Sequence, residues 1–212
     1  MDAPLVVGDW NRDGYVDAMA RNSSTGAMWL FHGNARGGFS SPTGGWGDWR
    51  RRSMITAVGD FDGDGWPDLM SRSPNGAVRW HPGRGDAGFA KARVARASGF
   101  PTGSSVVAVG RWDSDGAPDV VVRSGDGVMW LYRGNGPGGL ESPVRVGRGF
   151  DRYNRLVGVG DLTGDGQADL LGRVRNGDMW LIPGLVASSK RPSGAFAPRQ
   201  FVASGWSSFR FA

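Results

Sequence analysis

The chain has 212 residues, of which 39% are hydrophobic and 21% are charged, and its formal net charge is +5. This composition supports a packed core and argues against a disordered tail, and no apolar run approaches the roughly 18 residues of a membrane span. With no Cys and 2 His, thiol catalysis, thiolate metal sites and His-based zinc clusters are excluded. The first residues lack the basic and apolar regions of a signal peptide, so we expect none in this sequence.

One sequence unit recurs four times along the chain. A first marker glycine follows an apolar run at steps of 50 to 51 residues, at Gly8, Gly59, Gly110 and Gly160. A second marker glycine keeps the same step, at Gly33, Gly83, Gly134 and Gly184. Self-similarity at this period indicates a repeat architecture, with repeats at approximately 1–52, 53–103, 104–154 and 155–212.

Each repeat is expected to hold four short strands, separated by turns rich in Gly, Pro, Asn and Asp. In chain order, the clearest examples are 27–31, 55–58, 68–72, 119–123, 128–132, 143–146, 156–159 and 178–182. Four strands in about 50 residues are typical of one propeller blade. We therefore predict an all-β fold, a β-propeller of four blades with four antiparallel strands each, forming a single domain over residues 1–212.

The number of repeats bears on assembly. The tail of the sequence matches the segment that precedes each first strand, so the chain holds a whole number of repeats. A closed monomeric ring of four blades is the favoured arrangement, because propellers with four blades exist. A head-to-tail dimer of eight blades and a piece of a longer array remain alternatives.

An acidic loop of nine residues lies between the first and second strands of each repeat. Oxygen-bearing side chains at positions 1, 3, 5 and 9, a Gly at position 6 and the carbonyl at position 7 suit Ca²⁺ better than Mg²⁺, which demands stricter octahedral geometry. We expect about three structural Ca²⁺ sites. Their ligands would be Asp9, Asn11, Asp13, Tyr15 and Asp17 in the first loop, Asp60, Asp62, Asp64, Trp66 and Asp68 in the second, and Asp161, Thr163, Asp165, Gln167 and Asp169 in the fourth.

The third loop departs from this pattern. Arg111 stands where the other loops have their first aspartate, and Asp113, Asp115 and Asp119 follow it. A guanidinium at that place would neutralise the remaining carboxylates in the way that a cation does. We therefore expect the third loop to be metal-free or weak, and the fourth loop, with Thr163, to bind less tightly than the second.

These Gly-Asp-x-x-x-Asp-Gly-x-x-Asp loops resemble FG-GAP/VCBS repeats, which build the integrin α-subunit propeller and fungal propeller lectins. The resemblance extends over the whole chain. It implies a propeller, one calcium ion in each intact loop, and a secreted or extracellular role in adhesion or glycan binding. Bacterial modules of this kind are often attached to secreted hydrolases.

Two aromatic series recur in step with the repeats. The first, Trp29, Trp130 and Trp180, lies on the expected third strand and is interpreted as core. The second lies between repeats and consists of Trp46, Phe100, Phe150 and Trp206, with Trp49, Tyr153 and Phe209 three residues further on. These side chains either fill the gap between neighbouring blades or stack against a sugar ring beside polar donors.

A non-enzymatic binding module is the expected function, with a glycan or a cell-surface polymer as its ligand. Three Ca²⁺ ions would raise the formal net charge from +5 to +11, which favours an anionic partner. Nothing in the sequence indicates specific nucleic-acid binding. The alternatives are an assembly or targeting module of a larger secreted protein or toxin, which would bind a protein, and a propeller hydrolase or lyase that uses His81, Arg79 and a metal.

Overall fold

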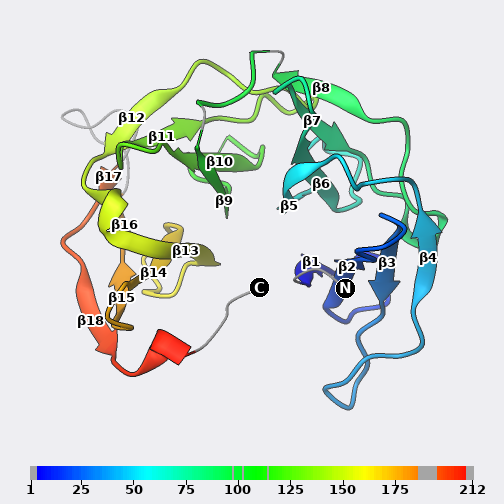
Figure 1. Cartoon of the computed structure of the whole chain (residues 1–212), viewed down its shortest axis with the longest axis horizontal. Helices are drawn as coiled ribbons and strands as arrows, with labels where there is room; N and C mark the ends of the chain where they lie inside the picture. The colour runs from blue at the N-terminus through cyan, green and yellow to red at the C-terminus, as the bar shows by residue number, and fades with distance from the viewer. Residues whose placement is uncertain (1–3, 97, 102, 114, 186–194, 209–212) are drawn as a thin grey trace. The chain divides into compact units, whose positions relative to one another are not determined.

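The computed structural model describes residues 4–96, 98–101, 103–113, 115–185 and 195–208 (Figure 1). Within them, four antiparallel sheets of four strands form the blades of a β-propeller, and the strands of each sheet lie side by side in chain order. The predicted all-β class and four-bladed organisation are thus confirmed. In the described residues, no helix has both the length and the apolar character that crossing a membrane would require.

The strands and the short 3-10 helices follow one another along the chain in this order. The first sheet holds β1 (Leu5–Gly8), β2 (Asp17–Arg21), β3 (Met28–Phe31) and β4 (Thr43–Trp46), and the second holds β5 (Ser53–Gly59), β6 (Asp68–Arg72), β7 (Val78–His81) and β8 (Arg93–Arg96), with η1 (Gly85–Ala87) between its last two strands. The third holds β9 (Ser105–Gly110), β10 (Asp119–Arg123), β11 (Met129–Tyr132) and β12 (Val144–Gly147), followed by η2 (Phe150–Arg152). The fourth holds β13 (Tyr153–Gly160), β14 (Asp169–Val174), β15 (Met179–Ile182) and β18 (Gln200–Ala203), with the small β16 (Gly184–Leu185) and β17 (Ala195–Phe196) pair before β18 and η3 (Trp206–Ser208) after it.

Both marker glycines have a structural reason. The first ends the first strand of each blade with a positive φ of 65° to 77°, where a side chain would be strained, and an irregularity in strand pairing lies beside it. The second approaches the loop backbone closely. A Cβ on Gly83, for example, would lie 2.0 Å from the Pro67 carbonyl oxygen. The repeat spacing therefore reflects one backbone conformation and one close backbone contact that favour glycine.

By its internal contacts the chain divides into two compact units. The first holds the first two blades and Gly136–Gly139, and the second holds the last two blades. The core of the first unit includes Val7, Trp10, Met19, Met28, Leu30 and Leu69. The core of the second includes Trp112, Val121, Met129, Leu131, Phe150 and Leu170. Each unit thus has its own packed interior between two adjacent blades.

Successive side chains of the third strand in each blade lie alternately in two environments. Met28 and Leu30 of β3 are buried, whereas Trp29 between them is only half-buried, as are Trp130 and Trp180 at the equivalent positions. The tryptophans interpreted as core therefore lie on the opposite face of their strand from the most buried side chains. Trp80 is 1% exposed because it pairs with Met70, as Leu30 pairs with Met19, and so occupies the core position.

Candidate functional site: cation loops and an aromatic pocket

The last aspartate of every acidic loop is a buried acceptor, 0–1% exposed, that ties the loop to its blade. One carboxylate oxygen accepts the N–H of the second loop residue at 2.7–2.9 Å. The other accepts the N–H of the second marker glycine, also at 2.7–2.9 Å. The residues are Asp17, Asp68, Asp119 and Asp169. These carboxylates close the loops through backbone contacts, a role that the sequence interpretation, which treated position 9 only as a metal ligand, did not include.

The second loop offers the best fit for a hard cation. Asp60, Asp62 and Asp64 each supply a carboxylate oxygen, and these oxygens lie within 4.8 Å of one another. Asp60 Oδ2 accepts the N–H of Gly65 at 2.9 Å, while its buried Oδ1 has no hydrogen-bond partner among the described residues. A buried acceptor without a donor needs an explanation, and a cation shared with two further carboxylates would supply one.

Burial also makes the second loop electrostatically unfavourable on its own. It raises the pKa of Asp68 to about 7, and the charges of Asp62 and Asp64 add to this effect. The pKa of Asp62 is raised as well, chiefly by burial. The backbone donors Phe61 and Gly83 only partly offset this effect at Asp68. The raised pKa values of Asp62 and Asp68 favour either a proton or a cation at this loop.

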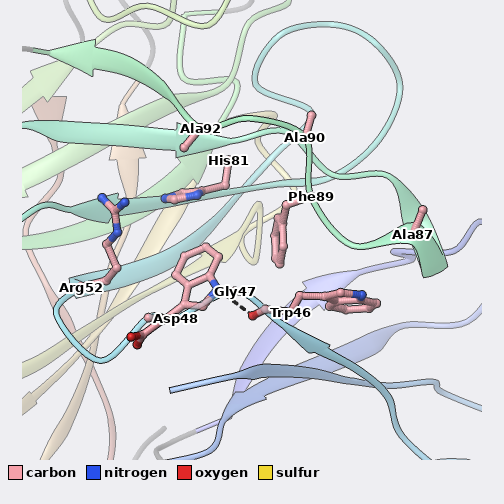
Figure 2. A pocket seen from close by; sticks show the side chains of 10 residues that line it. Trp46, Gly47, Asp48, Arg52, His81, Ala87, Phe89, Ala90 and Ala92 are labelled. Carbon is pink, nitrogen blue, oxygen red and sulfur yellow. Dashed lines mark hydrogen bonds between the residues drawn. The ribbon is translucent and has the colours of Figure 1, made fainter. Parts of the chain in front are cut away.

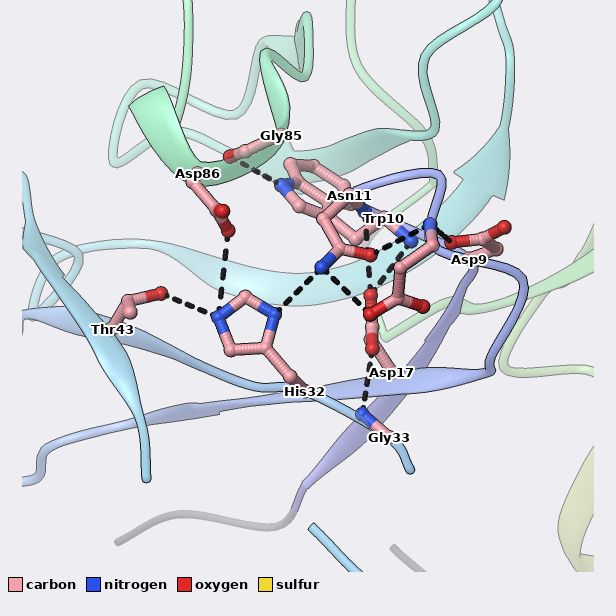
Figure 3. A network of polar contacts seen from close by, with 10 residues as sticks. Asp9, Trp10, Asn11, Asp17, His32, Gly33, Thr43, Gly85 and Asp86 are labelled. Atoms are coloured by element: carbon pink, nitrogen blue, oxygen red, sulfur yellow. Dashed lines mark hydrogen bonds and ion pairs between the residues drawn. The ribbon is translucent and has the colours of Figure 1, made fainter. Parts of the chain in front are cut away.

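A histidine belongs to the first loop, which the sequence interpretation missed. His32, Asp13 and Asp17 supply ligand atoms within 4.8 Å of one another, and Asp9 lies outside this group. Figure 3 shows His32 Nδ1 facing Asn11 Nδ2, 3.1 Å away, while its Nε2 lies 3.0 Å from the Thr43 hydroxyl. The ring therefore joins the loop to β4.

An arginine occupies the corresponding place beside the third loop. Arg133 Nε lies 2.7 Å from Asp113 Oδ2, an ion pair in which the N–H does not point at the oxygen. Arg111, which the sequence interpretation expected to neutralise the loop, is exposed. The cation that the structure pairs with this loop is thus Arg133, and neutralisation by Arg111 stays a prediction. Comparison of the residue before each second marker glycine would have found Arg133: the sequence reads His32, Pro82, Arg133 and Pro183 there.

The fourth loop shares the backbone closure of the second. Asp161 accepts N–H groups from Gly164, Asp165 and Gly166 at 2.7–3.0 Å. At position 7 of the three loops expected to bind, the N–H of the residue donates to the position-5 aspartate at 2.8–2.9 Å. These residues are Tyr15, Trp66 and Gln167. Their carbonyls as ligands, and Thr163 as a ligand, stay predictions.

A pocket of about 390 Å³ lies within the first unit, between its two blades (Figure 2). Trp49 stacks on the His81 ring with centroids 4.3 Å apart, and Phe89 lies 5.1 Å from Trp49. Trp46 meets the edge of Phe89 at 6.0 Å and receives the Trp49 indole N–H on its carbonyl oxygen at 3.2 Å. Arg52 completes the polar side of the lining. This size and mixture of rings with few polar groups are typical of small-ligand sites.

The expected ligand-binding aromatics fall into two groups. Trp49, Phe100, Phe150 and Tyr153 are 4–7% exposed, so they pack between strands as the gap-filling interpretation expects. Trp46 and Trp206 are half-buried. Phe209 lies outside the described residues. Of the whole series, Trp46 and Trp49 line the pocket.

The structure also corrects how the repeats align in this segment. The N–H of Trp49 donates to the Gly26 carbonyl at 2.9 Å, as Phe150 does to Gly127 at 3.0 Å. Trp206 repeats the contact with Gly177 at 3.1 Å. Trp49, and not Trp46, is therefore the equivalent of Phe150 and Trp206. Trp46 pairs with Met28 as Gly147 pairs with Met129, and so occupies the position of a glycine.

Comparison with known proteins supports this architecture. The model of the FG-GAP-like repeat matches three times, at residues 9–71, 60–122 and 111–172. A 104-residue stretch is 32% identical to human integrin alpha-7, covering 42% of this chain and 9% of the integrin. The fold matches a lectin from Agrocybe aegerita, described as recognising non-reducing terminal N-acetylglucosamine, with a TM-score of 0.63 and 18% identity over 97% of this chain and 54% of that one.

The chain thus spans a small part of its integrin relative and about half of the lectin chain. The three family matches overlap in register and together cover residues 9–172, including all four acidic loops. With the blades and the closed loops that the structure describes, they place this chain in the family of FG-GAP-like repeat proteins.

Proposed function

We propose that this protein is a calcium-stabilised, extracellular binding module that holds a glycan in the pocket of its first unit. The pocket carries this proposal, because Trp46, Trp49 and Phe89 offer ring surfaces beside the polar groups of Arg52 and His81. Aromatic faces with a few placed polar groups suit a sugar, which has an apolar ring face and hydroxyls at its edge. The lectin-like fold supports the same class of ligand.

Calcium would serve this module by fixing the loops. The second loop gathers three carboxylates around a buried oxygen without a donor, so a bound cation would relieve their repulsion. Arg12, from the first loop, lies 3.8 Å over the Trp66 ring of the second and donates from Nε to the Gly65 carbonyl at 3.1 Å. A fixed second loop would therefore help to hold the first two blades, and the pocket between them, in place. Calcium-rich surroundings outside the cell fit loops of this kind.

Binding without catalysis is the activity that the polar groups favour. Ser71 Oγ lies 2.8 Å from His81 Nε2, which resembles a nucleophile beside its base. Ser71, however, is 0% exposed, and burial together with Arg52 and Arg79 lowers the pKa of His81 to about 3. A base with this pKa has little driving force for taking a proton at neutral pH. We propose that the contact between Ser71 and His81 fixes the orientation of the His81 ring in the wall of the pocket.

A glycan array in calcium tests the proposal. We expect hits for the intact protein and their loss in Trp46→Ala, because Ala203 occupies the equivalent position in the fourth blade and the fold tolerates it there. Trp180→Ala is the matched control, since Trp180 is half-buried in the second unit and does not line the pocket. An array without hits, or hits that survive in Trp46→Ala, would contradict glycan binding at this site. An empty array would favour a protein partner instead.

A further inference from the structure

The second unit contains the same inter-blade position in a filled form. Phe150 and Phe196 lie 5.3 Å apart there, and Tyr153 lies 6.0 Å from Phe150, all within the hydrophobic core of that unit. A Cβ on Gly147 would lie 2.6 Å from the Phe150 ring, so the ring packs directly on the backbone. Aromatic side chains therefore fill this place between the last two blades.

The pocket of the first unit arises from substitutions at those equivalent positions. Trp46 stands in place of Gly147, and Arg52, three residues after Trp49, stands in place of Tyr153. His81 ends β7 where Ile182 ends β15. Two apolar core positions therefore carry an arginine and a histidine in the first unit. Replacing buried apolar groups with polar ones weakens packing, so these two residues point to a ligand.

Arg52 carries the positive charge of this pocket, and Asp48 carries a negative charge at its rim. Arg52 Nη1 donates to the Ser73 hydroxyl at 2.6 Å, and the described residues pair no carboxylate with Arg52. Burial and the nearby Arg79 lower the pKa of Arg52, and they keep His81 neutral. The Asp48 carboxylate at the rim is engaged by Arg50 Nη2 at 2.6 Å. An anion reaching Arg52 would therefore meet a guanidinium with remaining donors.

The backbone that carries Arg52 is also held in position. Arg21 Nη1 donates to the carbonyl oxygens of Trp49 and Arg52, at 2.8 and 3.0 Å. The Arg21 side chain thus fixes the backbone of both Trp49 and Arg52. Figure 2 shows Arg52 to the left of His81 and Phe89 to its right. A fixed cation beside ring surfaces suits a rigid ligand with an apolar face and an anionic substituent.

We propose that the pocket selects a sugar that carries a carboxylate, with the ring against Trp46, Trp49 and Phe89 and the carboxylate on Arg52. This inference rests on the proposed glycan binding and names its ligand class. Arg52 offers donors that match the two oxygens of a carboxylate, which a neutral sugar leaves unused.

The test compares two probes that differ at one carbon. Methyl β-glucuronide carries a carboxylate where methyl β-glucoside carries a hydroxymethyl group. Calorimetric titration of the intact protein in calcium should show the glucuronide binding about tenfold more tightly or better, as charge-assisted hydrogen bonds warrant. Arg52→Gln should bind both probes with the affinity that the intact protein has for the glucoside, and Trp46→Ala should weaken both.

Arg36→Gln is the matched control, because Arg36 is an exposed arginine of the first unit that does not line the pocket. Its preference for the glucuronide should persist. Arg52→Lys, which keeps the charge without the planar fork, should show a reduced preference and serves if Arg52→Gln does not fold. Equal binding of both probes by the intact protein, or a preference unchanged in Arg52→Gln or lost in Arg36→Gln, would overturn the carboxylate inference while glycan binding stands. Binding of neither probe, with an empty array, would overturn both proposals.

Discussion

The second and third acidic loops show two ways to balance the same charge. Both are closed by a buried last aspartate, Asp68 or Asp119, that accepts backbone N–H groups at both oxygens. In the second loop three carboxylates converge and Asp60 keeps a buried oxygen without a donor. In the third loop Arg133 reaches Asp113 from the neighbouring strand end. The difference indicates that the closed loop belongs to the blade itself, whereas its surroundings vary: the third loop has an arginine beside it, and the second has converging carboxylates that fit the proposed cation.

Removing calcium should reveal the largest difference between the second and third loops. At about 100 times its dissociation constant, an ion bound only to the folded state stabilises it by about 2.7 kcal/mol, which lowers Tm on chelation by roughly 5–10 °C per site. Asp60→Asn should therefore lower the number of bound calcium ions by one and reduce the Tm change on adding EGTA. Native mass spectrometry counts the ions, and calorimetry follows Tm.

Asp113→Asn is the control in the third loop and should leave the ion count unchanged. If Asp113→Asn removes an ion, the third loop binds calcium and Arg133 does not replace it. If Asp60→Asn keeps the full count, the second loop is closed by its backbone contacts alone.

Removing Arg133 should have a smaller but calcium-independent effect. Arg133→Gln leaves Asp113 without its paired cation, and losing one partner of a half-buried charged contact costs about 1–3 kcal/mol. The free energy of unfolding, measured with urea in EGTA, should fall by that amount. The exposed Arg111→Gln should change it by no more than about 0.5 kcal/mol. An equal or larger loss in Arg111→Gln would restore the residue that the sequence pointed to.

The fold was predictable because its determinants are local and repeated. The strands at 68–72 and 119–123 were placed within their observed bounds, since each begins at the last aspartate of a loop and ends at an arginine. The strands at 55–58 and 156–159 were placed too short, because β5 and β13 begin at Ser53 and Tyr153, in segments without apolar alternation. Repetition reveals which contacts each blade makes within itself, and these fix most of the architecture.

The site was only partly predictable, because its special residues break the repeat. His32 and Arg133 approach the loops from the end of the third strand, about 15 residues away from the last loop aspartate in sequence. Arg52 and His81 line the pocket from opposite sides of the sequence of the second blade, one just before β5 and the other at the end of β7. The spacing of residues along one repeat does not reveal which side chains from different strands come into contact. The misalignment of Trp46 with Phe150 has the same origin, because both follow a glycine in sequence but pair differently.

The pH dependence of calcium binding provides the finest distinction between the two loops. Burial raises the pKa of Asp68 from 3.8 to about 7, so without calcium the folded protein retains a proton that the unfolded chain has lost between about pH 4 and 7. Stability from this group is therefore present at low pH and lost as the pH rises through that window. Calcium competes with the proton, so the apparent affinity of the second loop should rise by up to about tenfold, or 1.4 kcal/mol, per pH unit between pH 5 and 7.

Calcium titrations at several pH values in this range measure the slope, and Asp60→Asn provides the control. Asp119 also has a pKa raised by burial, to about 6, but Arg133 stands beside its loop, so its titration should change stability equally with and without calcium. The difference between calcium and EGTA consequently isolates the loops that bind ions. An affinity that stays flat from pH 5 to 7 would mean that Asp68 is ionised without calcium, held by its backbone donors. In that case the backbone N–H groups would already balance the charge of both loops. Arg133 beside the third loop would then not take the place of an ion.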